Sequence, residues 1–331
     1  MPGLITHYLL GKDVLGYIYD DKIKSTILRH KDAYNLGLQG PDFFFYDISH
    51  SMKSKGFNYG RLIHTNHTGV FFQHMLKGAS LLSEKKRETA LAYIYGFLCH
   101  FAMDCTAHPY IMYMACFKTE NKHERQLSST SHTYFETAID TEMLLIKRGL
   151  TPNKLRRQDL IDVSEDELKV ISHIFAYAFN KTFHQHTTAQ QILNSIHNCY
   201  LTNLVLQDDK HIKISLFEKI EKSFLGYSLV TGIMYYKNAR IKWDVLNRMN
   251  DVWCLPWDDT AKSSASFIDL YDDAALLASK LINDADSIIN WGIKPDDFLD
   301  RIGNRSYITG VNCEKQLFMK HFRSETKDIV C

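Results

Sequence analysis

The sequence contains few residues that break helices and has almost no excess of charge. Only 6 of its 331 residues are proline and 16 are glycine, which argues against a turn-rich all-β protein. The formal net charge is +1, so no bulk positive field attracts nucleic acid or an anionic membrane. We therefore expect no stable nucleic-acid partner.

The sequence also has no pattern typical of disulfides, of a membrane span or of a leader peptide. The 7 cysteines are scattered singly, without a CxxC pair, which favours reduced thiols over a disulfide framework. The most apolar later run, residues 223–236, is too short and too interrupted to cross a bilayer. The first residues lack the basic and long apolar segments of a signal peptide. We therefore predict a cytoplasmic protein without a transmembrane segment, with secretion as the lesser alternative.

Helical periodicity, in contrast, runs through most of the chain. Ser164 with Glu167 and Thr188 with Gln191 are spaced as helix-capping boxes, and Gly149 is placed to end a helix. Apolar residues recur every three or four positions in segments 7–19, 67–84, 87–108, 128–149, 164–183, 188–206 and 263–292. We predict a single all-α domain over residues 1–331, a bundle of roughly eight to ten helices.

One apolar helical segment carries three metal-type ligands at four-residue intervals. His100 and Asp104 share one helix face about 6 Å apart along the axis, so they can bind one ion together. His108 lies about 12 Å from His100, which is too far for a shared coordination shell. Because Pro109 follows, we expect the helix to end there and His108 to turn toward a second ion. The spacing therefore predicts a cluster of ions with Asp104 between two sites.

A second pair, His132 and Glu136, again stands four residues apart. Imidazole and carboxylate ligands without thiolate suit a hydrolytic zinc site with open positions. A single histidine on an apolar helix more often bonds to a carbonyl in the core, but two such pairs about 30 residues apart favour metal. Further candidates lie upstream at His7, Asp42, His64 and His67.

These elements, in this order, resemble the bacterial zinc-dependent phospholipase C family. The similar stretches are "THYLLG", "QGPDFFFY", "GRLIHTNHTGVFF", "YGFLCHFAMDCTAHPY" and "SHTYFETAID", all within residues 1–145. The likeness continues more loosely through "WCLPWDDTAKSSASFIDLYDDA" and "IGNRSYITG". The resemblance implies an all-α fold with zinc ions in a cleft. A related group of nucleases for single strands shares the arrangement.

The resemblance also implies a ligand set and a general base. Asp42 would take the proton from the attacking water. The first zinc would be bound by Asp42, His64, His100 and Asp104, the second by His108, His132 and Glu136, and the third by His7 and the bridging Asp104. His64 is chosen over His67 because it directly follows "GRLI". Secreted members complete the third site with an N-terminal tryptophan, whereas this sequence reads Met-Pro-Gly, so either two or three ions are expected.

The resulting hypothesis is a zinc-dependent phosphodiester hydrolase, with a phospholipid headgroup as one candidate substrate. One alternative keeps this chemistry on nucleotides, single strands or a small phosphodiester. Another is a helical scaffold whose metal site is structural or vestigial. Phosphohydrolases with an adjacent His-Asp dipeptide are excluded, because the sequence contains none.

In residues 150–331 we expect supporting helices and a loop at 253–260 that either covers the cleft or buttresses the bundle. The aromatic run 43–46 could line the cleft or belong to the core.

Overall fold

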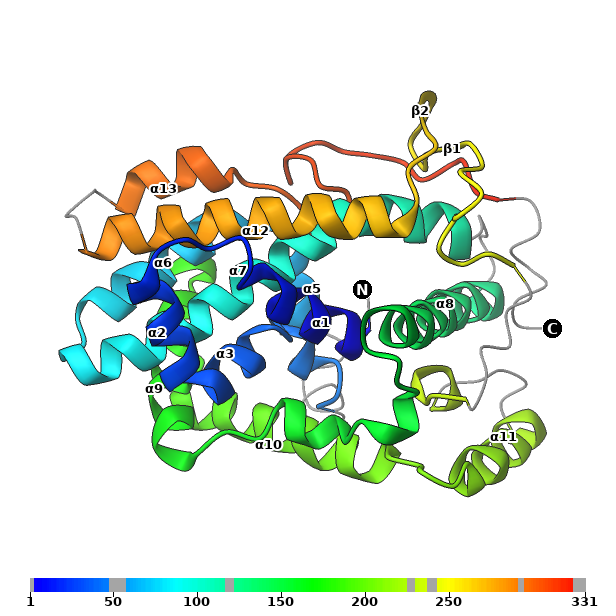
Figure 1. Ribbon diagram of the computed structural model, residues 1–331, viewed down its shortest axis with the longest axis horizontal. Helices are drawn as coiled ribbons and strands as arrows, with labels where there is room; N and C mark the ends of the chain where they lie inside the picture. Colours follow the sequence, from blue (N-terminus) through cyan, green and yellow to red (C-terminus); the bar gives the residue numbers. More distant parts are fainter. Residues whose placement is uncertain are drawn as a thin grey trace.

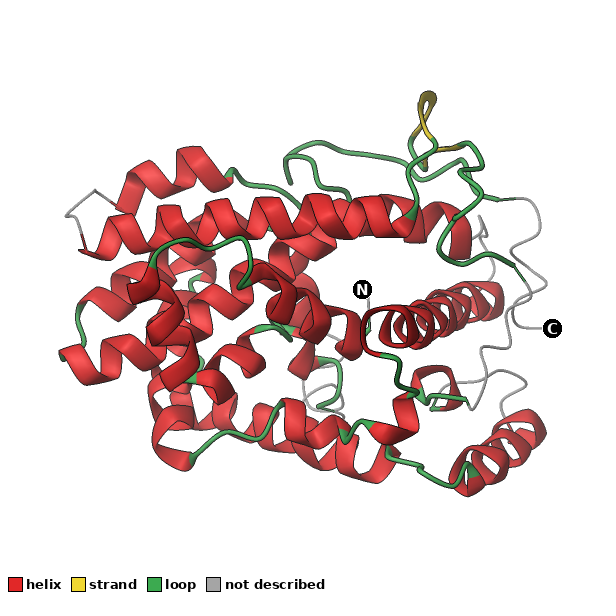
Figure 2. Cartoon of the chain, viewed as in Figure 1, coloured by secondary structure: helices red, strands yellow, loops and turns green. Residues whose placement is uncertain are grey.

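The computed structural model describes residues 3–47, 58–116, 122–224, 230–236, 243–290 and 295–323, and their regular secondary structure is nearly all helix (Figures 1 and 2). The described helices are α1 (Leu4–Val14), α2 (Asp21–Arg29), α3 (Lys31–Gly37), α5 (Tyr59–Thr65), α6 (Thr68–Ser80), α7 (Glu84–Ala115), α8 (Lys122–Arg148), α9 (Glu165–Phe183), α10 (Ala189–Leu206), α11 (Ile212–Phe224), α12 (Phe267–Asn290) and α13 (Pro295–Ile302). The predicted all-α class is confirmed. The number of described helices exceeds the prediction, because α2, α3, α5, α11 and α13 lie outside the segments in which helical periodicity was identified.

The longest helix, α7, is buried along most of its length and forms the centre of the bundle. It is apolar on nearly every side because other helices surround it: α12, α3, α1, α6, α8, α9 and α2 all pack against it. Gly96 allows the backbones of α7 and α3 to approach each other closely, since a Cβ at this position would lie 2.1 Å from the carbonyl oxygen of Tyr34 on α3. Tyr95 donates a hydrogen bond of 2.7 Å to Asp286 of α12. A central helix in this position can present side chains to several neighbours at once.

Helix α7 does not end at Pro109, as the sequence had suggested, but continues to Ala115. Proline lacks the N–H that would bond to the carbonyl of Cys105 four residues earlier. That carbonyl lies against Gly310, where a Cβ would come within 2.4 Å of the oxygen. His108 therefore remains on α7.

The predicted caps agree with the structure. The side chain of Ser164 accepts from the backbone N–H of Glu167, and Thr188 with Gln191 forms a complete capping box. Gly149, at a φ of 65°, follows the last residue of α8. Among the described residues no helix combines the length and the apolar character needed to cross a membrane. The single-domain prediction stays a prediction.

The segment predicted as a loop at 253–260 contains strands instead. Strands β1 (Trp253–Leu255) and β2 (Asp258–Ser263) form an antiparallel hairpin in which Trp253 pairs with Ser263. The Trp253 ring lies 5.4 Å from that of Tyr110 on α7, and its indole N–H donates to the carbonyl of Ala265. The base of the hairpin therefore packs against the central helix, in agreement with a buttressing role.

Four short 3₁₀ helices complete the described elements: η1 (Asp42–Phe44), η2 (Pro152–Lys154), η3 (Arg157–Leu160) and η4 (Thr231–Ile233).

Candidate metal centre

Five of the eight predicted ligand residues meet around Asp104 at the middle of α7. We call His7, Asp42, His64, His100 and Asp104 the inner cluster. One oxygen of Asp104 lies 3.4 Å from Nε2 of His7, and the other lies 3.1 Å from Nε2 of His100 and 3.5 Å from Nε2 of His64. Asp42 lies 3.3 Å from Nε2 of His64 and 3.7 Å from Nε2 of His100. Side chains from α1, η1, α5 and α7 thus converge on one carboxylate.

The turn before η1 brings Asp42 against this helix. Gly40 has a φ of 50°, in the left-handed region that glycine adopts without strain. A Cβ on Gly40 would lie 2.2 Å from the ring of His100, so any larger residue would displace that ring. The "GPD" turn is therefore required both for its backbone conformation and for the space that it leaves to His100.

Backbone carbonyls fix the orientation of three of the imidazole rings. Nδ1 of His64 lies 2.6 Å from the carbonyl of Gly60, Nδ1 of His100 lies 3.2 Å from that of Leu38, and Nδ1 of His108 lies 2.9 Å from that of Tyr307. A carbonyl can only accept, so each Nδ1 carries the proton and donates it. In the neutral ring the lone pair is then on Nε2, and this is the tautomer that can bind a metal ion through Nε2.

The inner cluster contains buried polar atoms that no other group satisfies. Nε2 of His7, His64 and His100, one oxygen of Asp42 and both oxygens of Asp104 have no hydrogen-bond partner. A buried carboxylate without hydrogen bonds costs several kcal/mol. A divalent cation would satisfy these atoms together, and nitrogen and oxygen ligands suit zinc. The residues present therefore fit a metal ion.

Electrostatics inside the inner cluster point the same way. Burial alone would raise the pKa of Asp104, but attraction to His100 and His108 holds it well below its usual value. Burial opposes charge on His64, yet the carboxylates of Asp104 and Asp42 raise its pKa to about 9. The carboxylates thus hold a positive charge at this position, and an ion bound through Nε2 would replace the proton.

The remaining three predicted ligands form a second group, the outer cluster: His108, His132 and Glu136. Nε2 of His132 lies 2.8 Å from Glu136, and Nε2 of His108 lies 3.9 Å from the same oxygen. Burial lowers the pKa of His108 to about 3 and that of His132 well below its usual value, which keeps both rings neutral. Nδ1 of His108 also lies 3.7 Å from Asp104, so the two clusters adjoin.

Asp140, one turn beyond Glu136 on α8, positions the first helix. Its carboxylate accepts from the backbone N–H of Ile5 at 3.1 Å and of Thr6 at 2.8 Å, and from the hydroxyl of Tyr235. It therefore caps the start of α1 from another helix, because the first turn of a helix leaves its N–H groups without partners. This capping places His7 beside Asp104. Burial raises the pKa of Asp140, and the hydrogen bonds it accepts oppose that shift.

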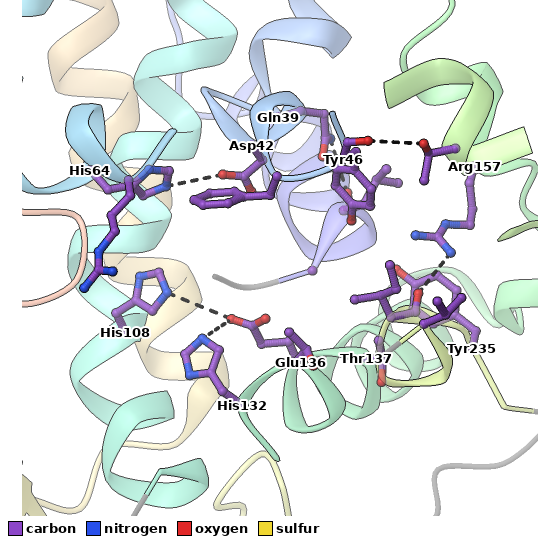
Figure 3. Close-up of a pocket in the computed structure, with 18 of the residues that line it drawn as sticks. Gln39, Asp42, Tyr46, His64, His108, His132, Glu136, Thr137, Arg157 and Tyr235 are labelled. Atoms are coloured by element: carbon purple, nitrogen blue, oxygen red, sulfur yellow. Dashed lines mark hydrogen bonds and ion pairs between the residues drawn. The ribbon is translucent and has the colours of Figure 1, made fainter. Parts of the chain in front are cut away.

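A cavity of about 560 Å³ opens beside both clusters (Figure 3). Asp42, His64, His108, His132 and Glu136 line it on one side, and Arg157 and Tyr235 lie on the opposite side. Thr202, Val230 and Ile233 also line the cavity. His7, His100 and Asp104 are buried behind that wall. None of the described residues of the β1–β2 hairpin lines the cavity.

The structure also distinguishes site residues from other residues where the sequence left both possibilities open. His64 lies in the inner cluster, whereas His67 is exposed and caps α6 in a left-handed conformation. In the aromatic run, Phe43 and Phe44 belong to the core, but Phe45 and Tyr46 line the cavity. Arg157 and Tyr235 were missed, because nothing in their local sequence marks them as cavity residues.

A family model described as zinc dependent phospholipase C matches residues 6–184, which is more than half of the chain. The chain belongs to this family. No curated protein and no solved structure matches it.

Proposed function

We propose that the protein is a zinc-dependent hydrolase of phosphodiester bonds, similar to phospholipase C. One observation carries the proposal: eight histidines and carboxylates from five elements meet in two adjoining clusters beside a cavity. Membership of the zinc-dependent family supports this chemistry. The cavity volume of about 560 Å³ falls within the usual range for small-molecule sites. A phospholipid headgroup is the substrate class that the family favours.

The ligands assigned to the first zinc are Asp42, His64, His100 and Asp104, and those of the second are His108, His132 and Glu136. The geometry of His7 beside Asp104 supports a third ion. Bound zinc would lower the pKa of a water molecule toward about 7 and neutralise phosphoryl oxygens. The chain itself supplies rings held by carbonyls, so the ligand geometry is set before substrate arrives.

Asp42 is the proposed general base. It lines the cavity, whereas the other carboxylate of the inner cluster, Asp104, is buried behind the wall. A base must reach the proton that it removes, and only a group on the cavity wall can do so. Asp42 would accept the proton of the attacking water, and Asp104 would keep the rings of His7, His64 and His100 oriented.

The proposal is tested by measuring zinc content and hydrolysis of bis(4-nitrophenyl) phosphate and of a short-chain phosphatidylcholine. We expect two or three zinc ions per chain, loss of hydrolysis after chelation and recovery when zinc returns. A protein that is fully loaded with zinc, hydrolyses no diester and unfolds on chelation would instead be a scaffold with a structural metal. Preferential hydrolysis of single-stranded nucleic acid or nucleotides would retain the chemistry and change the substrate. The cytoplasmic location stays a prediction, to be checked by cell fractionation.

A further inference from the structure

A buried arginine faces the metal ligands from the far wall of the cavity. Arg157 lies in η3, is only 3% exposed and lines the cavity. Figure 3 shows its guanidinium across the cavity from His64, His108 and His132. Pro152 and Gln158, its neighbours in the chain, are buried as well.

The guanidinium is held in place but is not neutralised. Nη1 donates to the carbonyl of Ile233 at 3.1 Å, and the group lies 4.9 Å from the centre of the Tyr235 ring. Nε is buried and has no hydrogen-bond partner. In the part of the chain that the structure describes, no carboxylate lies within 4.0 Å of Arg157, although arginine stays charged in proteins.

The aromatic neighbour does not supply the missing negative charge. Burial raises the pKa of Tyr235 well above its usual value, and the nearby carboxylate of Asp140 adds to the effect. The phenol is therefore neutral, and its O–H donates a hydrogen bond to the carboxylate of Asp140. A cation buried without a counter-charge is costly, and a ligand anion would remove that cost.

We propose that Arg157 binds a second anionic group of the substrate, a phosphate monoester or a carboxylate on the headgroup, while the metal side takes the scissile phosphate. The proposal rests on the proposed function. Asp42 and Glu136 are the acidic residues of the described cavity wall, and both belong to the metal side. A quaternary ammonium headgroup would face a positive charge at Arg157 without a compensating carboxylate. The site therefore selects anionic headgroups over choline.

The forked guanidinium explains why the group should be phosphate or carboxylate. Its N–H donors lie in one plane and match two oxygens of either anion. Hydrogen bonds to charged groups contribute about 1.5–3 kcal/mol, which corresponds to at least about tenfold in affinity. This is the effect that an experiment should resolve.

The test uses headgroup monoesters, which a phosphodiesterase cannot cleave, with the zinc-loaded full-length chain in a calorimeter. Two pairs of compounds differ by one anionic group: O-phosphoserine against phosphoethanolamine, and inositol 1,4-bisphosphate against inositol 1-phosphate. We expect the more anionic member of each pair to bind at least about tenfold more tightly. In Arg157→Gln the ratio should fall to within about twofold.

Arg156→Gln is the matched control. Arg156 is the preceding residue, its side chain is 68% exposed, and it pairs with Asp159 at 3.5 Å outside the cavity. This variant should keep the preference. If Arg157→Gln does not fold, Arg157→Lys retains the charge without the planar fork, and its ratio should fall severalfold. Equal affinity for both members of each pair, or a wild-type ratio in Arg157→Gln or Arg157→Lys, would overturn the proposal.

The two proposals fail in different ways. A protein that prefers the anionic members but hydrolyses no diester would retain the Arg157 subsite and lose the proposed function. A protein that hydrolyses diesters but binds both members equally would lose only the subsite.

Discussion

The inner and outer clusters use the same two kinds of side chain, but their positions differ. In the inner cluster Asp104 is fully buried and its two oxygens approach three imidazoles from α1, α5 and α7. In the outer cluster His132 is 17% exposed and all three residues line the cavity. The inner cluster therefore reaches the cavity only through Asp42 and His64, whereas every residue of the outer cluster lines it.

Asp104→Asn should have the largest effect, since this carboxylate is common to the whole inner cluster. An amide cannot balance the charge of bound ions or keep the pKa of His64 high. We expect bound zinc to fall by more than one equivalent and hydrolysis to fall by about 100-fold or more. Elemental analysis together with initial rates checks this. Loss confined to a single ion would count against a bridging role.

Glu136→Gln should affect only the outer cluster. We expect the loss of one zinc equivalent and about 10- to 100-fold in rate, while thermal unfolding of the zinc-free protein changes little. Glu142→Gln is the control, because Glu142 lies on the same helix and pairs at 4.0 Å with Arg248 instead of the clusters. Global unfolding of the Glu136 variant would assign this residue a structural role.

Asp140→Asn should disturb the inner cluster from a distance by weakening the cap on α1. The amide keeps one oxygen but replaces the other with an NH2 group, so either Ile5 or Thr6 loses the acceptor for its backbone N–H, which leaves a buried donor unsatisfied. We expect the free energy of unfolding of the zinc-free protein to fall by about 1–3 kcal/mol. Urea denaturation measures the change. An unchanged midpoint would show that the cap does not stabilise the fold.

His67→Ala should have the smallest effect, since its exposed side chain belongs to neither cluster. Zinc content and hydrolysis should equal those of the unchanged protein. A zinc equivalent lost in this variant would show that the wrong histidine of "LIHTNH" had been assigned to the inner cluster.

The sequence by itself determined the all-α class, most of the longer helices and which residues are candidates for metal ligands. Apolar residues at helical spacing can be read locally, and a four-residue interval places His100 and Asp104, or His132 and Glu136, on one face. Caps at Ser164 and Thr188 are likewise local, because each involves residues three apart. The continuation of α7 through Pro109 was predicted wrongly, because a proline locally favours the end of a helix whereas the folded chain keeps it inside one.

Only the tertiary structure decided which of these side chains share a site. The approach of His7 to Asp104 depends on a cap from Asp140, more than 130 residues away. The position of Arg157 on the cavity wall depends on contacts with Ile233 and Tyr235. No periodicity encodes such pairings, because burial and the convergence of separate helices fix them after the chain has folded.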